Sequence, residues 1–350
     1  MQRLAQTAVV TAALVGAPLA HADPMNVTIE MHVESFDSAA NAKVVRLVAE
    51  QAAAHPVSAH PVHIDFGFAP KFVEYLMTTY AGEGLPSSVI EDEGDGVWAD
   101  EYVQYLTSLG HGVTAHVEYD DLSWVPRADQ LKAQLADIED IGGDPTNASG
   151  VAHPDERWVE MSTDAGLTVV SGVVRWAQAG LDPFNPYQVA GRFVTDPALG
   201  LAAPCTAPTC HEAAPANWST ADDATEKAQR LAGWRAADTR TFLTDSGSST
   251  DLLVMSSARD ASLDCLAASG ACAYTTATDG MSAARALAHE VSEDRATYGA
   301  TGSDSVYITW STNRMPSDEF IRGFFGALPN QTRLRGVEFL TVAEAAAEHP

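Results

Sequence analysis

Four short stretches of the chain carry the same chemical signature, a histidine placed two residues before a carboxylate. Acidic residues occupy 47 of the 350 positions, so the ten histidines after position 22 would give only about 1.3 such pairs by chance. In a β-strand this spacing puts both side chains on one face. Imidazoles and carboxylates gathered in this way are what a metal centre or an acid–base site requires. The stretches are His32-Val33-Glu34, His63-Ile64-Asp65, His116-Val117-Glu118 and His153-Pro154-Asp155.

The segments around these stretches alternate between predicted strands and predicted helices. Residues 27–34 alternate apolar and polar side chains, which places His32 and Glu34 on the polar face of a strand. A helix after most strands implies a parallel sheet, and the first strand is not followed by the glycine-rich phosphate loop of an open dinucleotide-binding sheet. The pattern therefore predicts an α/β fold, a distorted (β/α)7–8 barrel. The predicted strands are 27–34, 61–66, 112–118, 149–153, 167–174, 251–257, 305–310 and 337–340. The predicted helices are 38–54 with Ser38 as candidate cap, 70–80, 99–109, 126–140, 155–165, 281–297, 317–327 and a last one with a capping box from Thr341 to Glu344.

The beginning of the chain predicts export. Residues 1–22 are interpreted as a secretory signal peptide, because Arg3 precedes an apolar stretch that ends in Ala-His-Ala at 20–22. Residues 23–350 then form a single mature domain, secreted or periplasmic. No later stretch reaches the ~18 apolar residues of a membrane span. The net charge of −27 disfavours nucleic acids, whose phosphates need clustered Lys and Arg, and it disfavours anionic membrane surfaces.

Residues 175–250 interrupt the alternation and are rich in Pro, Ala and Asp, which predicts a long insertion in the barrel. An even number of cysteines in an exported chain favours two disulfides. Their close spacing favours Cys205–Cys210, within the insertion, and Cys265–Cys272, although three connectivities are possible. A zinc site is the alternative, but neither pair has C-x2-C spacing.

The position of the histidine–carboxylate pairs agrees with their chemistry. In parallel β/α folds active sites form at the carboxyl ends of the strands, and the four pairs are predicted to lie at such ends. Zinc binds histidine nitrogens and carboxylate oxygens and keeps one position open in catalytic sites. It then makes hydroxide available near neutral pH, while a spare carboxylate or imidazole serves as general base or acid. His55, His60 and His111 have no carboxylate at this spacing and are predicted to be structural.

One of these stretches resembles a known family motif. Residues 110–120, Gly-His-Gly-Val-Thr-Ala-His-Val-Glu-Tyr-Asp, resemble the second motif of NodB-homology polysaccharide deacetylases, Gly-His-Glu-Ile-Gly-Asn-His-Thr-x-x-His. The strand with His32 and Glu34 stands where those enzymes carry Thr-Phe-Asp-Asp, and residues 336–349 resemble their last strand and helix. The resemblance implies a distorted (β/α)7 barrel with a divalent metal, often zinc, and removal of N- or O-acetyl groups from carbohydrate polymers.

The chain also departs from that family. Asp120 stands at the second metal histidine, His32 and Glu34 replace the Asp pair, and no Arg-x-Pro motif follows at the third position. The resemblance covers residues 27–175 in order and the rest loosely. A His-x-acid pair on the first strand is also similar to the class II α-mannosidase type of barrel, whose zinc is held by a His-x-Asp pair.

Residue pattern and resemblance together predict a site. The predicted ligands of a divalent metal, with zinc as the expected ion, are His32, Glu34, His116 and Asp120. Glu118 shares the strand face of Asp120, so it stays open as the ligand in its place. The residues predicted to act as general acid or base, or to orient the ligands, are Asp65, His153 and Asp155.

The predicted function is that of an exported, metal-dependent hydrolase acting on carbohydrate, in the manner of a divergent polysaccharide deacetylase. One alternative is a glycoside hydrolase on a related barrel, with Glu34 and Asp155 as its two carboxylates, about 5–5.5 Å apart for retention or ~6.5–9.5 Å for inversion. A second alternative is a non-catalytic protein that binds carbohydrate or metal. Metal content and the products released from acetylated glycans separate the three.

Overall fold

The computed structural model describes residues 25–86, 98–118, 128–151, 157–174, 188–189, 192–193, 233–239, 245–262, 275–298, 305–312 and 315–349. Residues 1–22, the four cysteines, Asp120, His153 and Asp155 lie outside these residues. The signal peptide and both disulfides therefore stay predictions. Among the described helices, none has the length and apolar content needed to cross a membrane.

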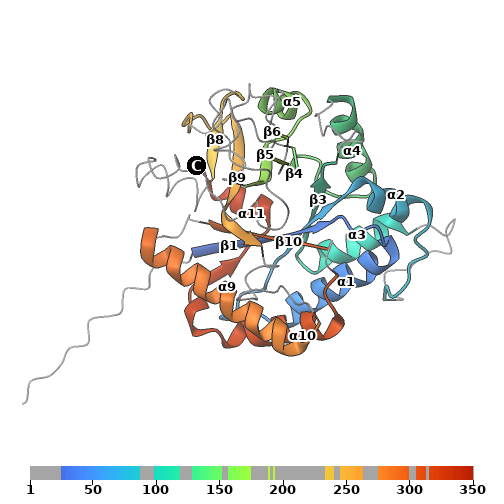
Figure 1. Ribbon diagram of the computed structural model, residues 1–350. Coiled ribbons are helices and arrows are strands. Elements are labelled where there is room, and N and C mark those ends of the chain that lie inside the picture. Colours follow the sequence, from blue (N-terminus) through green and yellow to red (C-terminus); the bar gives the residue numbers. More distant parts are fainter. Residues whose placement is uncertain are drawn as a thin grey trace, which may run out of the picture.

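Seven strands of the described chain pair side by side in parallel. In spatial order they are β1 (Met25–Val33), β2 (Asp65–Phe68), β3 (Gly112–His116), β4 (Asn147–Ser149), β5 (Val169–Val174), β9 (Leu252–Ser262) and β10 (Ser305–Ser311). β10 pairs with both β9 and β1, so the pairings return to their start. The register of the β9–β10 pairing shifts between Tyr307 and Thr309. This arrangement is consistent with the predicted distorted barrel (Figure 1).

The alternation of β1 separates the two faces of the barrel wall. Val27 and Ile29 belong to the main apolar core between strands and helices. Glu30, on the opposite face, accepts a hydrogen bond from Ser171 of β5, a strand that does not pair with β1. This contact crosses the barrel interior, so the polar face of β1 is the inner one, as the period of two requires.

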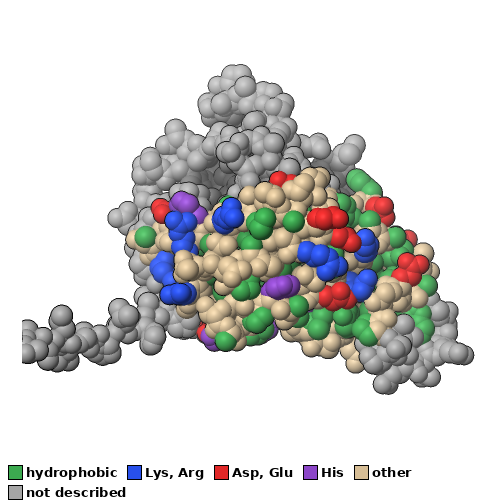
Figure 2. Space-filling view, turned by 90° about the horizontal axis from the view of Figure 1, so that it is seen from below, with side chains coloured by type: hydrophobic (Ala, Val, Ile, Leu, Met, Phe, Trp, Pro, Cys, Tyr) green, Lys and Arg blue, Asp and Glu red, His purple; other side chains and the backbone are tan. Residues whose placement is uncertain are grey.

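Helices surround the strands in Figure 1. They are α1 (Ser38–Ala54), α2 (Pro70–Thr78), α3 (Ala99–Ser108), α4 (Ala128–Asp140), α5 (Trp158–Asp164), α9 (Ala277–Tyr298) and α10 (Asp318–Ala327), with short 3-10 turns η4 (Leu328–Asn330) and η5 (Thr332–Leu334). The predicted bounds of α1 are confirmed, but its cap is Asp37 rather than Ser38, because the Asp37 carboxylate accepts from the Ala40 amide. Seen from below, the surface over α9 and α10 carries acidic and basic side chains intermixed, without one continuous apolar area (Figure 2).

A short last strand, β11 (Val337–Phe339), makes β2 begin later than the sequence predicts. β11 pairs with Met25–Val27 of β1, whereas β2 pairs only with Glu30–Val33. Val62 forms a parallel bridge with Phe339, so the segment before Asp65 pairs with β11 and not with β1. The strand predicted at 61–66 is therefore displaced, and Asp65 begins β2 instead of ending it.

The amino end of the barrel is filled by α11 (Val342–Ala347). The predicted capping box is confirmed: the Thr341 hydroxyl accepts from the Glu344 amide, and the Glu344 carboxylate accepts from the Thr341 amide. Val342 and Ala345 pack inside the barrel against a small apolar cluster, formed by Val169, Leu253, Met255 and Tyr307. A hollow of about 290 Å³ opens beside this helix, lined in part by Asp144, Asn147 and Arg235.

The described part of the predicted insertion contains two features. β6 (Gln188–Val189) and β7 (Arg192–Phe193) form an antiparallel pair. β8 (Trp234–Ala236) adds antiparallel to the first residues of β9. The last part of residues 175–250 thus joins the main sheet through the pairing of β8 with β9. Trp234 and Ala236 of β8 are buried.

Candidate metal centre

Three side chains converge at the carboxyl ends of β1 and β3. Glu34 directly follows β1, His116 is the last residue of β3, and Glu118 lies two residues further on. One ligand atom from each lies within 4.8 Å of the others. The structure therefore brings together two of the four predicted metal ligands, Glu34 and His116, and places Glu118 beside them.

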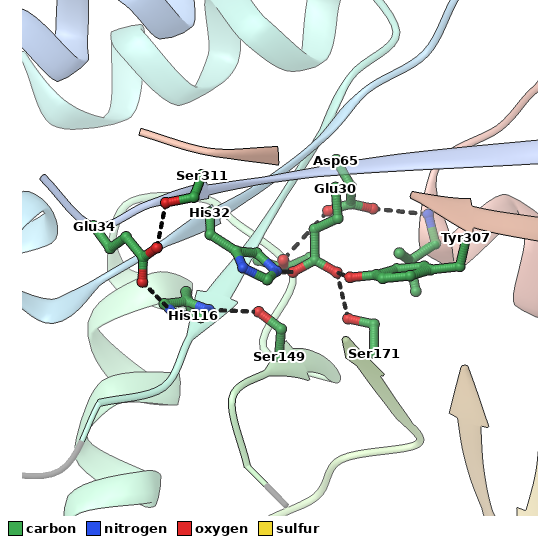
Figure 3. A network of polar contacts seen from close by, with 11 residues as sticks. Glu30, His32, Glu34, Asp65, His116, Ser149, Ser171, Tyr307 and Ser311 are labelled. Carbon is green, nitrogen blue, oxygen red and sulfur yellow. Dashed lines mark hydrogen bonds and ion pairs between the residues drawn. The ribbon is translucent and has the colours of Figure 1, made fainter. Parts of the chain in front are cut away.

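Hydrogen bonds fix His116 at both ring nitrogens. Its Nε2 lies 3.1 Å from Oε2 of Glu34, and its Nδ1 lies 2.9 Å from the Ser149 hydroxyl at the end of β4 (Figure 3). The Ser149 hydroxyl also helps to lower the pKa of Glu30, so we assign its proton to that carboxylate and its lone pair to the Nδ1–H of His116. With Nδ1 protonated, Nε2 donates to ionised Glu34 only while the ring is an imidazolium, and it offers its lone pair to a metal once that proton leaves.

The neighbouring strand β10 holds Glu34. The Ser311 hydroxyl donates to Oε1 of Glu34, and the Thr312 hydroxyl accepts from the Glu34 amide at 3.0 Å. Burial alone would raise the pKa of Glu34, but the hydrogen bond and charge of His116, with Ser311, lower it to about 2. Glu34 is therefore ionised at neutral pH.

The pKa of the third member, Glu118, is raised, whereas that of Glu34 is lowered. Gln134 of α4 donates to the Glu118 carbonyl and accepts from its amide, which fixes the main chain there. Burial raises the pKa of the Glu118 side chain; the charge of His116 opposes this rise, and the charge of Glu34 adds to it. Burial acts to lower the pKa of His116, but the hydrogen bond and charge of Glu34 raise it.

His32 lies beside this cluster but faces the other way. Its ring stacks on the ring of His116, with centroids 4.3 Å apart and planes inclined by 22°. Its Nε2 lies 3.4 Å from Oε1 of Glu30. Figure 3 shows His32 between the Glu34–His116 pair and Glu30. The structure thus pairs this predicted ligand with a buried carboxylate and not with the three converging groups.

Glu30 is a site residue that the sequence prediction missed. It is fully buried, and it accepts hydrogen bonds from the hydroxyls of Ser171, at 2.6 Å, and Tyr307. Burial would raise its pKa, but the hydrogen bond and charge of His32 and the hydroxyls of Ser149 and Ser171 lower it to about 2. The available signal was the face shared with His32 and Glu34. Its serine and tyrosine partners come from distant strands and give no local signal.

Gly67 of β2 leaves the space that this network occupies. A Cβ atom at this position would lie 2.9 Å from Oε1 of Glu30 and 3.3 Å from both Cβ of His116 and Oγ of Ser149. Glycine therefore leaves room for the buried Glu30 carboxylate to pack close to the backbone of β2, and any side chain here would have to displace that carboxylate.

Asp65 lies elsewhere than predicted. It opens β2 toward the amino end of the barrel, where its carboxylate accepts from the Val342 amide at 2.8 Å and the Thr114 hydroxyl at 3.3 Å. Its predicted place at the carboxyl end of a strand is wrong, because β11 displaces β2. No described contact joins its carboxylate to the three converging groups. Burial, together with the charge of Glu30, raises the pKa of Asp65 to about 7.

The raised pKa of Asp65 predicts a pH-dependent effect of Asp65→Asn. Because the folded-state pKa lies above the ordinary 3.8, the contribution of Asp65 is fully present below pH ~4 and is lost as pH rises through ~7. We expect the variant to gain stability relative to the wild type between pH 4 and pH 8, by up to roughly 4 kcal/mol. Urea unfolding at both pH values measures this gain, and Asp164→Asn, at an exposed helix position, controls for loss of charge. A difference that stays constant from pH 4 to pH 8 would contradict the assignment.

Two further histidines, His63 and His111, lie away from the three converging groups. His63 lies at the amino end of the barrel, where its Nδ1 is 2.8 Å from Oε2 of Glu344, so its expected place at a strand's carboxyl end is also wrong. His111 is buried; its Nδ1 accepts from the Ile64 amide and its Nε2 donates to the Ala49 carbonyl. Burial lowers the pKa of His111 to about 4. The predicted structural role of His111 is confirmed by these contacts.

Comparison with known proteins identifies solved structures with a similar fold. No protein-family model matches the sequence, and no curated protein matches it at a significant level. A GH57 branching enzyme from the archaeon Thermococcus kodakaraensis, solved with glucose, has a TM-score of 0.50 at 11% identity over 93% of this chain and 71% of its own. A 4-alpha-glucanotransferase from Thermococcus litoralis has a TM-score of 0.49 at 11% identity, over 93% of this chain and 40% of its own. A protein from Mycobacterium smegmatis that carries the name polysaccharide deacetylase has a TM-score of 0.47 at 11% identity, over 98% of this chain and 95% of its own. At such identities, the likeness to the branching enzyme shows a common barrel fold.

Proposed function

We propose that this protein is a metal-dependent hydrolase of carbohydrate esters or amides, with a divalent metal held by Glu34, His116 and Glu118. The observation that carries the proposal is the convergence of these three side chains within 4.8 Å at the carboxyl ends of neighbouring strands. The carbohydrate substrate is supported by the fold shared with a branching enzyme solved with glucose and by the motif resemblance of residues 110–120. Zinc is the proposed ion, and export is proposed from residues 1–22.

The donor set fits such an ion. Two carboxylates and one imidazole are the oxygen and nitrogen ligands that zinc accepts, and three protein ligands are typical of its catalytic sites. Burial raises the pKa of Glu118, and the charge of Glu34 adds to that rise. A cation between the two carboxylates removes their mutual repulsion. Ser149 and Ser311 orient His116 and Glu34 from behind, as outer partners of metal ligands do.

The chain's own residues supply the remaining chemistry. A divalent metal held by Glu34, His116 and Glu118 would supply Lewis acidity. His32 is held at Nε2 by ionised Glu30 and stacked on His116, so its Nδ1 is the atom through which a proton moves to or from the reacting groups. Water adds to the acetyl carbon, the bond to the sugar oxygen or nitrogen breaks, acetate leaves, and the sugar atom receives a proton.

A specific observation favours glycoside hydrolysis as a second candidate. Glu34 and Glu118 have oxygen atoms within 4.8 Å of each other, near the roughly 5–5.5 Å carboxylate separation of retaining glycosidases. Their environments also move their pKa values apart, downward for Glu34 and upward for Glu118. Such enzymes use one carboxyl group with a raised pKa as the acid and a second with a lower pKa as the nucleophile.

Metal content and product analysis test the proposal together. We expect the purified protein to hold about one divalent ion per chain and to release acetate from acetylated xylan or chitin oligosaccharides. A chelator should stop this release, and added metal should restore it. Release of reducing ends without acetate, unaffected by chelator, would establish the glycosidase instead. A protein that binds no divalent metal and releases neither product overturns both.

A further inference from the structure

One exposed aromatic side chain follows the metal-centre residue Glu34 closely in the chain. Phe36 lies two residues after Glu34, in the loop from β1 to α1, and is 87% exposed. Among the described large apolar side chains only Met77, at 37%, is also exposed. A single exposed apolar residue needs no explanation by itself, but Phe36 sits in a hydrogen-bonded loop with a lysine over its ring.

The loop that carries Phe36 is fixed on both sides. The Ser35 amide donates to the Thr312 hydroxyl at 3.2 Å, and the Ser35 carbonyl accepts from the side chain of buried Asn41 at 2.9 Å. Asp37 caps α1 through the Ala40 amide at 3.0 Å. The ring is therefore presented to solvent by an ordered backbone, which lowers the entropy lost when a ligand covers it.

A lysine that follows the next strand makes a cation–π contact with the Phe36 ring. Lys71, in the first turn of α2, places its Nζ 4.7 Å from the centroid of Phe36. Among the described residues Lys71 forms no ion pair, although its charge reaches Glu118. Phe36, Lys71 and Glu118 thus follow β1, β2 and β3 on the same end of the barrel. One face of the ring meets a cation, which leaves the other face open.

The surroundings of the ring define its ligand. Ser35 and Asp37, which flank Phe36, are polar, so the exposed apolar surface is the size of one ring and not of a protein interface. A pyranose has an apolar face that matches an aromatic ring and hydroxyl groups around its edge. A flat ligand with a hydrogen-bonding edge is what an aromatic face beside an ammonium group accommodates.

We propose that Phe36 and Lys71 form a sugar-binding subsite, in which a pyranose ring next to the reacting one stacks on Phe36 and hydrogen-bonds to the Lys71 ammonium. The inference rests on the proposed carbohydrate substrate and adds where the neighbouring sugar binds. It assigns Phe36 to substrate affinity and not to the chemical step.

Substitution of Phe36 tests the subsite without disturbing the fold, because the side chain is almost wholly exposed. We expect Phe36→Ala to weaken binding of acetylated xylo- and chito-oligosaccharides by about tenfold, measured by calorimetry, and to raise KM with kcat nearly unchanged. Phe36→Trp should retain affinity, and Lys71→Met should lose part of it. Met77→Ala, at the other exposed apolar residue, is the control and should bind as the wild type does.

The outcomes separate this inference from the proposed function. Equal glycan affinity and KM in the wild type and Phe36→Ala would overturn the subsite, even where acetate release and metal content support the enzyme. Weakened binding in Phe36→Ala would establish the subsite, even in a protein without hydrolytic activity. A wild-type protein that binds none of these oligosaccharides overturns both the subsite and the carbohydrate substrate. Thermal unfolding of each variant verifies that the fold is intact.

Discussion

Replacement of His116 by glutamine is expected to lower divalent-metal affinity by at least ~100-fold and to abolish metal-dependent hydrolysis. Loss of an outer partner of a metal ligand already costs about 10–100-fold, and His116 is the only nitrogen donor among the three converging groups. Glutamine keeps a polar group against Ser149, so the change removes the imidazole with little loss of packing. Elemental analysis of the purified protein and titration with zinc measure the effect.

A matched histidine lies at the other end of the barrel. His63 contacts Glu344 at 2.8 Å between nitrogen and oxygen, much as His116 contacts Glu34 at 3.1 Å. No third ligand joins His63 in the described part of the chain. His63→Gln should therefore retain metal content and activity. If His116→Gln binds metal as tightly as the wild type, then the three converging groups are not the metal site.

Much of the fold was accessible from local patterns. The bounds of α1 follow from its apolar spacing, and the inner and outer faces of β1 follow from strict alternation. The capping box of α11 was visible because all its groups lie within four residues. Such features depend on neighbours in the sequence, which is why they could be predicted.

The position of Asp65 could not be predicted in this way. Residues 61–66 read as one strand, and nothing in them indicates that β11, more than 270 residues later, pairs with their first half. This non-local pairing delays the contact with β1 until Asp65. It moves the Asp65 carboxylate and His63 to the amino end of the barrel, whereas Glu34, His116 and Glu118 lie at the carboxyl ends of β1 and β3.

The candidate site was predictable only where its residues belong to local strand patterns. The strand-end positions predicted Glu34 and His116 as ligands of one site and left Glu118 open as the alternative to Asp120, and the structure places Glu118 beside them. The orientation of His32 was not, because it depends on Glu30, whose charge is held by Ser171 and Tyr307 from other strands. The only sequence signal for Glu30 was the strand face that it shares with His32 and Glu34, and its burial followed only from the structure.

Replacement of Glu30 by glutamine is expected to cause the largest loss of stability. The carboxylate is fully buried and ionised, and it accepts from two hydroxyls while facing His32. Glutamine keeps one acceptor oxygen but places an amide where the second carboxylate oxygen faces His32. We expect the free energy of unfolding at pH 6 to fall by on the order of 3 kcal/mol.

The pH dependence of this loss identifies its cause. The pKa of Glu30 is lowered from 4.5 to about 2 on folding, so its stabilising contribution is complete above pH 4.5 and is lost as pH falls through 2. The difference between wild type and Glu30→Gln should therefore shrink from pH 6 to pH 3. The comparison begins at pH 6 because Asp65, whose pKa is raised to about 7 partly by Glu30, is mainly protonated there.

Two variants make the result specific. Glu74→Gln, on the exposed side of α2, changes charge alone and should leave stability nearly unaltered. Tyr307→Phe removes one hydroxyl donor to the charged carboxylate and should cost about 2 kcal/mol, less than the loss of the carboxylate itself. A Glu30→Gln protein as stable as the wild type at pH 6 would show that Glu30 is not held as an ion. If stability falls while hydrolysis is unchanged, Glu30 supports only the barrel, and His32 is not the group that moves the proton. Loss of both, with metal still bound, is the result expected when a buried carboxylate orients the histidine that works beside the metal.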